Sequence, residues 1–249
     1  MNPSRVPNEQ ELRELFAHSA DVRIRSYAFG DPDIRRTVLL AYCCGLTDSM
    51  QVNLYVLPRL EQWLNHMQEN PAAEPELEML PLQNTKEMAA RIFSGQLVIC
   101  CPELNRMFAL DLSDPPERSP NDSNTEISIK GPRDGFVESL QTNLALVRKR
   151  LPVTTLHIEQ MTIGTDLPST AALLYIDGKV QQQVIDEARR RLKHLQVDAI
   201  AGTSQLEELI SDHPFSLFPT ITYTGRPDFL VSCLLRGRFA ILVDNSPIA

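Results

Sequence analysis

Apolar and polar positions follow two different periods along the chain, and the changes between them predict a mixed α/β protein. In the first half, four segments show the alternation or the short apolar runs typical of strands: 21–29, 37–44, 97–101 and 107–112. Three segments show helical spacing: 9–20, a stretch from about Ser49, and 85–93. We expect Pro58 to kink or break the second helix, because proline lacks the N–H that a helix interior needs.

The second half shows the same two kinds of pattern. Strand patterns occupy 126–129, 155–162, 170–176, 220–223 and 239–243. Helical patterns occupy 136–150, 180–195, 204–210 and 227–235. In the helix over 180–195 we place Val184 on the inward face and Arg189 largely on the outward face.

The clearest break in the pattern is SDPPERSPNDSN over 113–124, which holds three prolines and no hydrophobic residue. Such a stretch is typical of an exposed linker. We therefore predict an N-terminal α/β subdomain over 1–112, a linker over 113–124 and a C-terminal α/β subdomain over 125–249. Each subdomain is expected to be a small mixed sheet with packed helices.

The two halves also share a pattern of glycines. Three glycines of the first half have counterparts at matching points of the second: Gly30, Gly45 and Gly95 correspond to Gly164, Gly178 and Gly237. We interpret this as an internal duplication; chance similarity between common α/β patterns is the alternative.

Composition narrows the class of protein. The chain has 24 Lys and Arg against 32 Asp and Glu, a net charge of −8, which does not suit a general nucleic-acid binder. No apolar run approaches the roughly 18–20 residues that span a bilayer, and the N-terminus has no hydrophobic signal core. As an isolated chain it is expected to be soluble and cytosolic.

Candidate chemistry is sparse. The sequence has no glycine-rich nucleotide loop, no zinc-protease motif and no nucleophile elbow, and its five histidines fall in different predicted elements. The cysteines at 43, 44, 100, 101 and 233 are expected to be small buried apolar residues, with a redox or ligand role as the alternative. Neighbours on a strand point to opposite faces, so neither adjacent pair is suited to chelate one metal. We therefore predict no catalytic residue, no metal site and no cofactor. The turn over 130–135 reads either as an anion-binding nest or as a helix start capped by Asp134.

Two long segments resemble a known family. SNTEISIKGPRDGFVESLQTNLALVRKRL (123–151) and DHPFSLFPTITYTGRPDFLVSCLLRGRFAILVDNSPIA (212–249) are similar to two signatures of the A subunits of bacterial spore germinant receptors, the GerA family. The chain departs from the second signature at His213, Gly225 and Asn245-Ser246, which puts any fine role of those positions in doubt.

The resemblance implies the hydrophilic N-terminal domain of a membrane protein whose transmembrane region is absent from this chain. It implies a location in the spore inner membrane, with this domain on the cytoplasmic side, and a complex with B and C subunits that senses nutrients. No reaction is implied. The expected role is non-catalytic, in germinant sensing, assembly and signal transduction. The alternative is a binding module that holds a small nutrient in the cleft between the two subdomains; an enzyme is disfavoured.

Polar residues that match the two signatures are the candidates for intersubunit or ligand contact, because core packing does not explain them. They are Arg133, Glu138, Asn143, Arg148, Arg150, Arg226 and Asp228. The competing interpretation is that these residues form ion pairs that lock a helix to the sheet.

Overall fold

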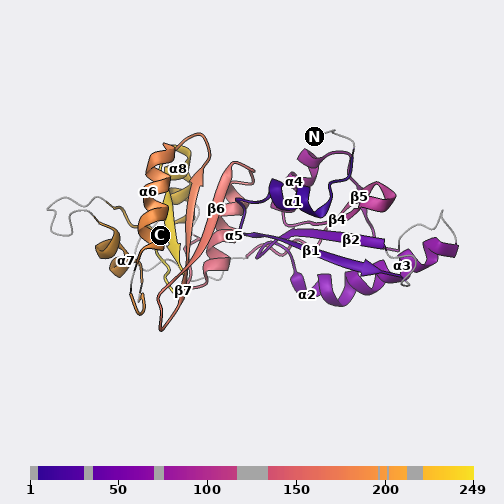
Figure 1. Cartoon of the computed structure of the whole chain (residues 1–249), viewed down its shortest axis with the longest axis horizontal. Helices are drawn as coiled ribbons and strands as arrows, with labels where there is room; N and C mark the ends of the chain where they lie inside the picture. The colour runs from indigo at the N-terminus through magenta and orange to yellow at the C-terminus, as the bar shows by residue number, and fades with distance from the viewer. Residues whose placement is uncertain are drawn as a thin grey trace. The chain divides into compact units, whose positions relative to one another are not determined.

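Two antiparallel sheets with packed helices form the framework of the protein (Figure 1). The structure, a computed structural model, describes residues 5–30, 36–69, 76–116, 134–195, 197–200, 202–211 and 221–249. Contacts divide the chain into a first unit, Met1–Ala17 with Asp21–Pro116, and a second unit, His18–Ala20 with Glu117–Ala249. The predicted mixed α/β class is confirmed. All pairings between the named strands are antiparallel, whereas mixed sheets were expected.

The first unit contains a five-stranded sheet in the order β1-β2-β4-β5-β3. Its strands are β1 (Val22–Phe29), β2 (Arg36–Cys43), β3 (Leu80–Pro81), β4 (Leu97–Cys101) and β5 (Arg106–Leu110). All five residues of β4 are buried, which explains why this strand reads as a continuous apolar run rather than as an alternation.

Helices cover this sheet. Trp63 and Leu64 of α3 (Leu57–Glu69) pack on the side chains of β2 and β4 that point to one face. α4 (Thr85–Phe93) contacts the same two strands and buries Ile92 and Phe93. The ring of Phe93 meets that of Phe16, which directly follows α1 (Glu9–Leu15), edge to face at 5.8 Å. Between β4 and β5 lies a short 3₁₀ turn, η2 (Pro102–Leu104).

Of the two effects predicted for Pro58, a kink or a break, the break does not occur. The helix runs from α2 (Ser49–Gln51) through a π-helical turn, η1 (Val52–Val56), into α3. The Leu57 N–H bonds to the Val52 carbonyl, five residues back. This wider turn accommodates the proline, which supplies no N–H for an ordinary helical bond and would crowd the preceding turn.

The second unit contains a three-stranded sheet in the order β6-β7-β8. Its elements are α5 (Leu140–Arg150), β6 (Leu156–Ile163), β7 (Ser169–Ile176), α6 (Gln182–Lys193), α7 (Thr203–Ile210), α8 (Pro227–Leu235) and β8 (Ala240–Val243). The side chains of β7 alternate between two cores. Leu174 faces α5 and α8, whereas Leu173 faces α6 and α7.

Three residues from the early chain complete this sheet. The Ile158 N–H donates to the His18 carbonyl at 2.8 Å, and the Ala20 N–H donates to the Ile158 carbonyl at 3.1 Å. The helix predicted over 9–20 therefore ends at Leu15, because the residues after it turn and bond to β6 instead.

Some of the other predicted element boundaries agree with the structure and others do not. The helices over 85–93 and 227–235 begin and end as predicted. The helix expected from residue 136 begins at Leu140, since Ser139, not Asp134, accepts a hydrogen bond from the first turn. Residues 221–223 form no strand, and the strand predicted over 126–129 lies outside the described residues.

Strand register supports the internal duplication. Leu40, five residues before Gly45, pairs with Ile99, four residues after Gly95. In the second unit Leu173, five residues before Gly178, pairs with Ile241, four residues after Gly237. The hairpins β1–β2 and β6–β7 also share one register relative to their glycines, as the pairs Tyr27↔Val38 and Met161↔Ala171 illustrate.

An equivalent close backbone contact occurs within each unit. Gly95 and Gly237 end α4 and α8 with positive φ values of 91° and 81°. A Cβ on Gly95 would lie 2.6 Å from the Leu46 carbonyl oxygen, and a Cβ on Gly237 would lie 2.7 Å from that of Lys179. Leu46 and Lys179 each directly follow the glycine after the second hairpin strand, so the two contacts are equivalent.

We predict that Gly95→Ala and Gly237→Ala each lower the free energy of unfolding by at least about 2 kcal/mol, because backbone strain adds to a steric clash. Gly178→Ala is the matched control: its φ is +74° but no atom lies within 4 Å of the added carbon. It should cost about 1 kcal/mol. Urea unfolding measures all three, and equal losses would contradict the proposed contact.

Candidate functional site

The two segments that resemble family signatures meet at the N-terminus of α5. The Leu140 N–H donates to the Asp244 carboxylate at 3.0 Å, so Asp244 satisfies one of the free amides of the helix start. The Asn245 N–H donates to the Glu138 carbonyl and the Phe136 N–H donates to the Gly225 carbonyl, both at 2.8 Å. The described parts of both signatures thus form one piece of architecture.

Two of the candidate residues are fully buried and bind main chain. Asn143 accepts a hydrogen bond from the Val137 N–H at 2.8 Å and donates to the Val137 carbonyl at 2.6 Å. Arg148 donates to the Val153 carbonyl at 2.8 Å and to the Leu156 carbonyl at 3.3 Å. These contacts fix the segments on either side of α5, which gives both residues a structural role.

The remaining described candidates lie nearer the surface. Arg150 forms an ion pair with Asp134, and Arg226 pairs with Asp228 at 2.6 Å. The hydrogen bond from Arg226 holds the pKa of Asp228 below its usual value. Glu138 is exposed, and no ion pair of its carboxylate occurs among the described residues. Arg133 lies outside the described residues.

The contact role of these seven residues therefore stays a prediction. The geometry supports the competing interpretation for several of them, since Asn143, Arg148 and Arg150 all bind groups within the second unit. Glu138 is the described candidate best placed to meet another molecule, because it is exposed beside a rigid helix start.

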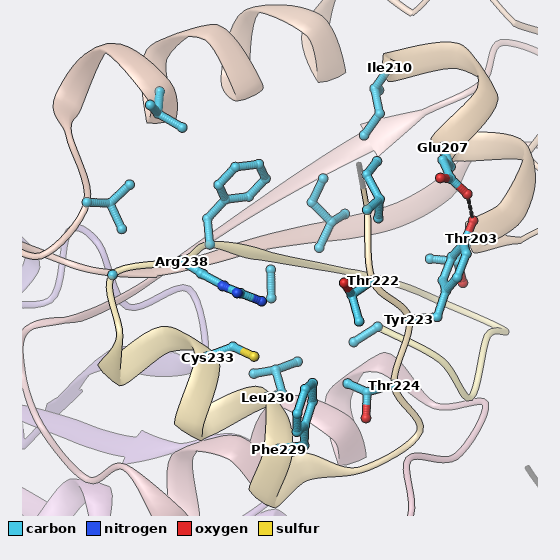
Figure 2. A pocket seen from close by; sticks show the side chains of 18 of the residues that line it. Thr203, Glu207, Ile210, Thr222, Tyr223, Thr224, Phe229, Leu230, Cys233 and Arg238 are labelled. Carbon is cyan, nitrogen blue, oxygen red and sulfur yellow. Dashed lines mark hydrogen bonds between the residues drawn. The ribbon is translucent and has the colours of Figure 1, made fainter. Parts of the chain in front are cut away.

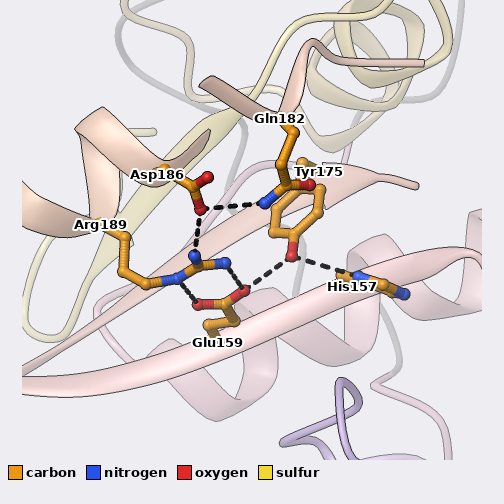
Figure 3. A network of polar contacts seen from close by, with 6 residues as sticks. All are labelled: His157, Glu159, Tyr175, Gln182, Asp186 and Arg189. Carbon is orange, nitrogen blue, oxygen red and sulfur yellow. Dashed lines mark hydrogen bonds and ion pairs between the residues drawn. The ribbon is translucent and has the colours of Figure 1, made fainter. Parts of the chain in front are cut away.

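A polar network on β6, β7 and α6 was not predicted (Figure 3). Arg189 binds both carboxylate oxygens of Glu159 at 2.7 Å, and the Tyr175 hydroxyl donates to the same carboxylate at 2.7 Å. Arg189 was expected to point outward and Val184 inward. The buried face of α6 instead carries Ile185 and Leu192, with Arg189 between them, while Val184 is 42% exposed.

The network shifts the pKa values of its members. The hydrogen bonds from Arg189 lower the pKa of Glu159, and burial together with the Glu159 charge raises the pKa of Tyr175 to about 12. Burial, followed by the charge of His18, lowers the pKa of His157. His18 and His157 stack with ring centroids 4.4 Å apart, and His157 Nδ1 lies 3.2 Å from the Tyr175 hydroxyl. Each of these groups is therefore held in place by contacts with the others.

The second unit also contains a cavity of about 730 Å³ (Figure 2). Side chains of α6, α7, α8 and β8 and the segment 221–224 line it. Most of the lining is apolar: Val180, Val184, Leu206, Ile210, Phe229, Leu230, Phe239 and Ile241. This size and composition are typical of a ligand site.

Charged groups enter the cavity from different sides. Figure 2 shows Arg238 extending into it from the start of β8 and Glu207 reaching it from α7. Glu207 accepts a hydrogen bond from Tyr223, and Lys179 donates to the Leu235 carbonyl at 2.8 Å. Sequence reasoning missed this site. Its one sequence signal is Arg238, a charge that interrupts two apolar segments.

The described residues contain no group of three or more His, Cys, Asp or Glu arranged to hold a metal ion. All five cysteines are free thiols, and burial raises the pKa values of Cys100 and Cys101 to about 12. Such thiols are protonated at neutral pH and unreactive as nucleophiles. In the ranges that the structure describes, no helix is long and apolar enough to cross a membrane.

Comparison with solved structures identifies the class of protein. The fold matches the crystal structure of the N-terminal domain of the A subunit of the Bacillus megaterium spore germinant receptor GerK3, with a TM-score of 0.69 and 26% sequence identity. The match covers 100% of this chain and 96% of that one. Both units therefore belong to one known domain architecture.

Sequence comparison gives the family. The model of the Bacillus/Clostridium GerA spore germination protein matches residues 10–249. Spore germination protein XA of Bacillus anthracis is 36% identical, and spore germination protein B1 of Bacillus subtilis (strain 168) is 34% identical, each over 97% of this chain and 51% of the relative. The chain belongs to the GerA spore germination family, and it spans about half the length of these relatives.

We predict that Arg148→Met lowers the free energy of unfolding by about 2–4 kcal/mol, because two carbonyl groups lose their buried donor. Lys149→Met is the control: Lys149 is the exposed neighbour in the same helix and should change stability by less than about 0.5 kcal/mol. Urea unfolding measures both. An unchanged stability of Arg148→Met would favour a contact role for Arg148 over the structural one.

The Glu159 network predicts a pH dependence of stability. A carboxylate with a lowered folded pKa stabilises the folded state above its unfolded pKa, here near 4.5, and this contribution is lost as pH falls through the folded value. Glu159→Gln should therefore destabilise most above about pH 5 and progressively less below pH 4.5. Glu208→Gln, at an exposed position, is the control. A constant difference across pH 3–7 would contradict the charge-based origin.

Proposed function

We propose that this chain is the N-terminal part of a germinant receptor A subunit and acts without catalysis, in receptor assembly and signal transduction. The observation that carries the proposal is the match, over the whole chain, to the N-terminal domain of one A subunit. The family model over residues 10–249 supports it independently. The polar network on β6, β7 and α6 consists of mutually paired groups, and Cys100 and Cys101 are buried thiols, which suits a scaffold better than a reaction centre.

The partners proposed are the B and C subunits of the receptor, with a small nutrient as the germinant. The whole protein is proposed to lie in the spore inner membrane through a transmembrane region outside this chain, with this domain on the cytoplasmic side. The relatives extend well beyond the matched region, which leaves room for such a region. The predicted linker over 113–124 would let the units move as separate bodies.

Within the second unit, the locked helix start of α5 supports the assembly role. The Gly225 carbonyl and the Asp244 carboxylate accept hydrogen bonds from this segment, and the Asn245 N–H donates one to it, so the segment before α5 is held in place. This arrangement presents the exposed Val137 and Glu138 side chains on a rigid support, and rigid support reduces the entropy cost of binding a partner.

Direct binding of a nutrient by this domain is the second candidate function. The sequence led us to expect the ligand in a cleft between the two subdomains, and that location stays a prediction. The specific observation in favour of binding is the cavity of about 730 Å³ inside the second unit, which has the apolar lining and the few polar groups of a ligand site.

The assembly proposal is tested by reversing the exposed charge. Glu138→Lys in the full-length subunit should weaken co-purification with the B and C subunits and the germination response, with the unfolding temperature of the isolated domain unchanged. Glu61→Lys, at an exposed position on α3 in the first unit, is the matched control and should leave both readouts at wild-type level. Normal assembly and germination of Glu138→Lys would count against this surface as an interface.

A further inference from the structure

The two units differ at one strand position, the position next to β4 in the first unit and next to β8 in the second. In the first unit, β4 lies between β2 and β5, and β5 is antiparallel to it. In the second unit, the equivalent strand β8 pairs with β7, and among the described strands it forms the edge of the sheet. The second unit therefore has no described counterpart of β5.

The cavity lies where that counterpart would be. Ala240 and Ile241 of β8 line it, with Leu206 of α7 from one helical layer and Leu230 of α8 from the other. Residues 222–224 form a further wall, as Figure 2 shows. A cavity that lies along a strand edge, between helices of both layers, can accommodate an extended peptide segment. Main-chain pairing to such an edge is a recurring mode of peptide recognition.

The charges give the occupant a direction. Lys179 and Arg238 lie at the start of β8, where Gly237 approaches the Lys179 carbonyl. Glu207 lies on α7, whose first residue, Thr203, bonds to Ser246 and Ile248 after the end of β8. One end of the cavity is thus cationic and the other end anionic.

The guanidinium group of Arg238 is available to bind a ligand. Arg238 is exposed at the cavity, and no hydrogen bond or ion pair to its side chain occurs within the described part of the chain. Glu207 has one described donor, the Tyr223 hydroxyl, and a carboxylate accepts several hydrogen bonds. Opposite charges at the two ends suit a molecule with a carboxylate at one end and an ammonium at the other.

We propose that this cavity binds a short, extended peptide with apolar side chains and free termini, in the position that β5 occupies in the first unit. Its carboxylate meets Arg238 and Lys179, and its ammonium group meets Glu207. This direction is antiparallel to β8, as β5 is to β4. The apolar side chains contact Val180, Leu206 and Phe239. The inference names the ligand class for the second candidate function and rests on that candidate, not on the assembly role.

The test titrates the purified chain with the tetrapeptide Ala-Val-Ile-Ala, followed by calorimetry and by chemical shifts of the β8 amides. We expect saturable binding with shifts in β8. The same peptide with an acetylated N-terminus and an amidated C-terminus should bind about tenfold more weakly, because both end charges are lost.

Two substitutions, each with a control substitution at a neighbouring residue, test where the two ends of the peptide bind. Arg238→Gln and Glu207→Gln should each weaken binding about three- to tenfold. Arg236→Gln and Glu208→Gln, at exposed neighbouring positions, should leave it unchanged. The Arg238 side chain makes no described hydrogen bond or ion pair, so we expect the variant to keep the fold, and an unchanged unfolding temperature verifies this.

Two results would overturn the inference. Equal affinities for the free and the capped peptide would mean that the β8 edge binds an internal strand of a protein and does not recognise the charged termini of a peptide. No binding of either form, or binding insensitive to Arg238→Gln, would remove the cavity as a peptide site. Neither result bears on the assembly proposal, which Glu138→Lys tests by co-purification and germination.

Discussion

A backbone contact without room for a side chain organises both units. At the end of α4 and of α8, a glycine in a left-handed conformation lies against the carbonyl of the residue that follows the hairpin. This contact brings the helix end to the end of the hairpin, so the next strand enters the sheet at one defined register. That register places β4 beside β2 in the first unit and β8 beside β7 in the second.

The signature segments are explained largely by the need to satisfy main-chain groups. A helix start exposes amides that must find acceptors, and Asp244 supplies one to α5 from 104 residues away. Asn143 and Arg148 saturate carbonyl and amide groups on either side of the same helix. Polar residues in such places maintain the architecture of the second unit.

The two repeats differ at the edge of the sheet, where a strand can be added or lost. Central strands are constrained on both sides by hydrogen bonds and on both faces by helices, whereas an edge strand can gain or lose a neighbour without disturbing the core. The first unit fills the position beside β4 with β5. The second unit has a cavity with charged ends beside β8, so the same framework supports packing in one copy and a candidate binding site in the other.

Features that depend on residues close together in the chain could be predicted from the amino-acid sequence. The helices over 85–93 and 227–235, the hairpins, the matching glycines and the family resemblance all rest on local spacing, which one segment carries alone. Other features became visible only in the folded chain. They are the π-helical turn before Pro58, the pairing of Glu159 with Arg189 and the burial of Arg148. The cavity lined by Lys179, Glu207 and Arg238 is a further example. Burial and pairing depend on which distant segment packs against a residue, and periodicity along the chain contains no information about that choice.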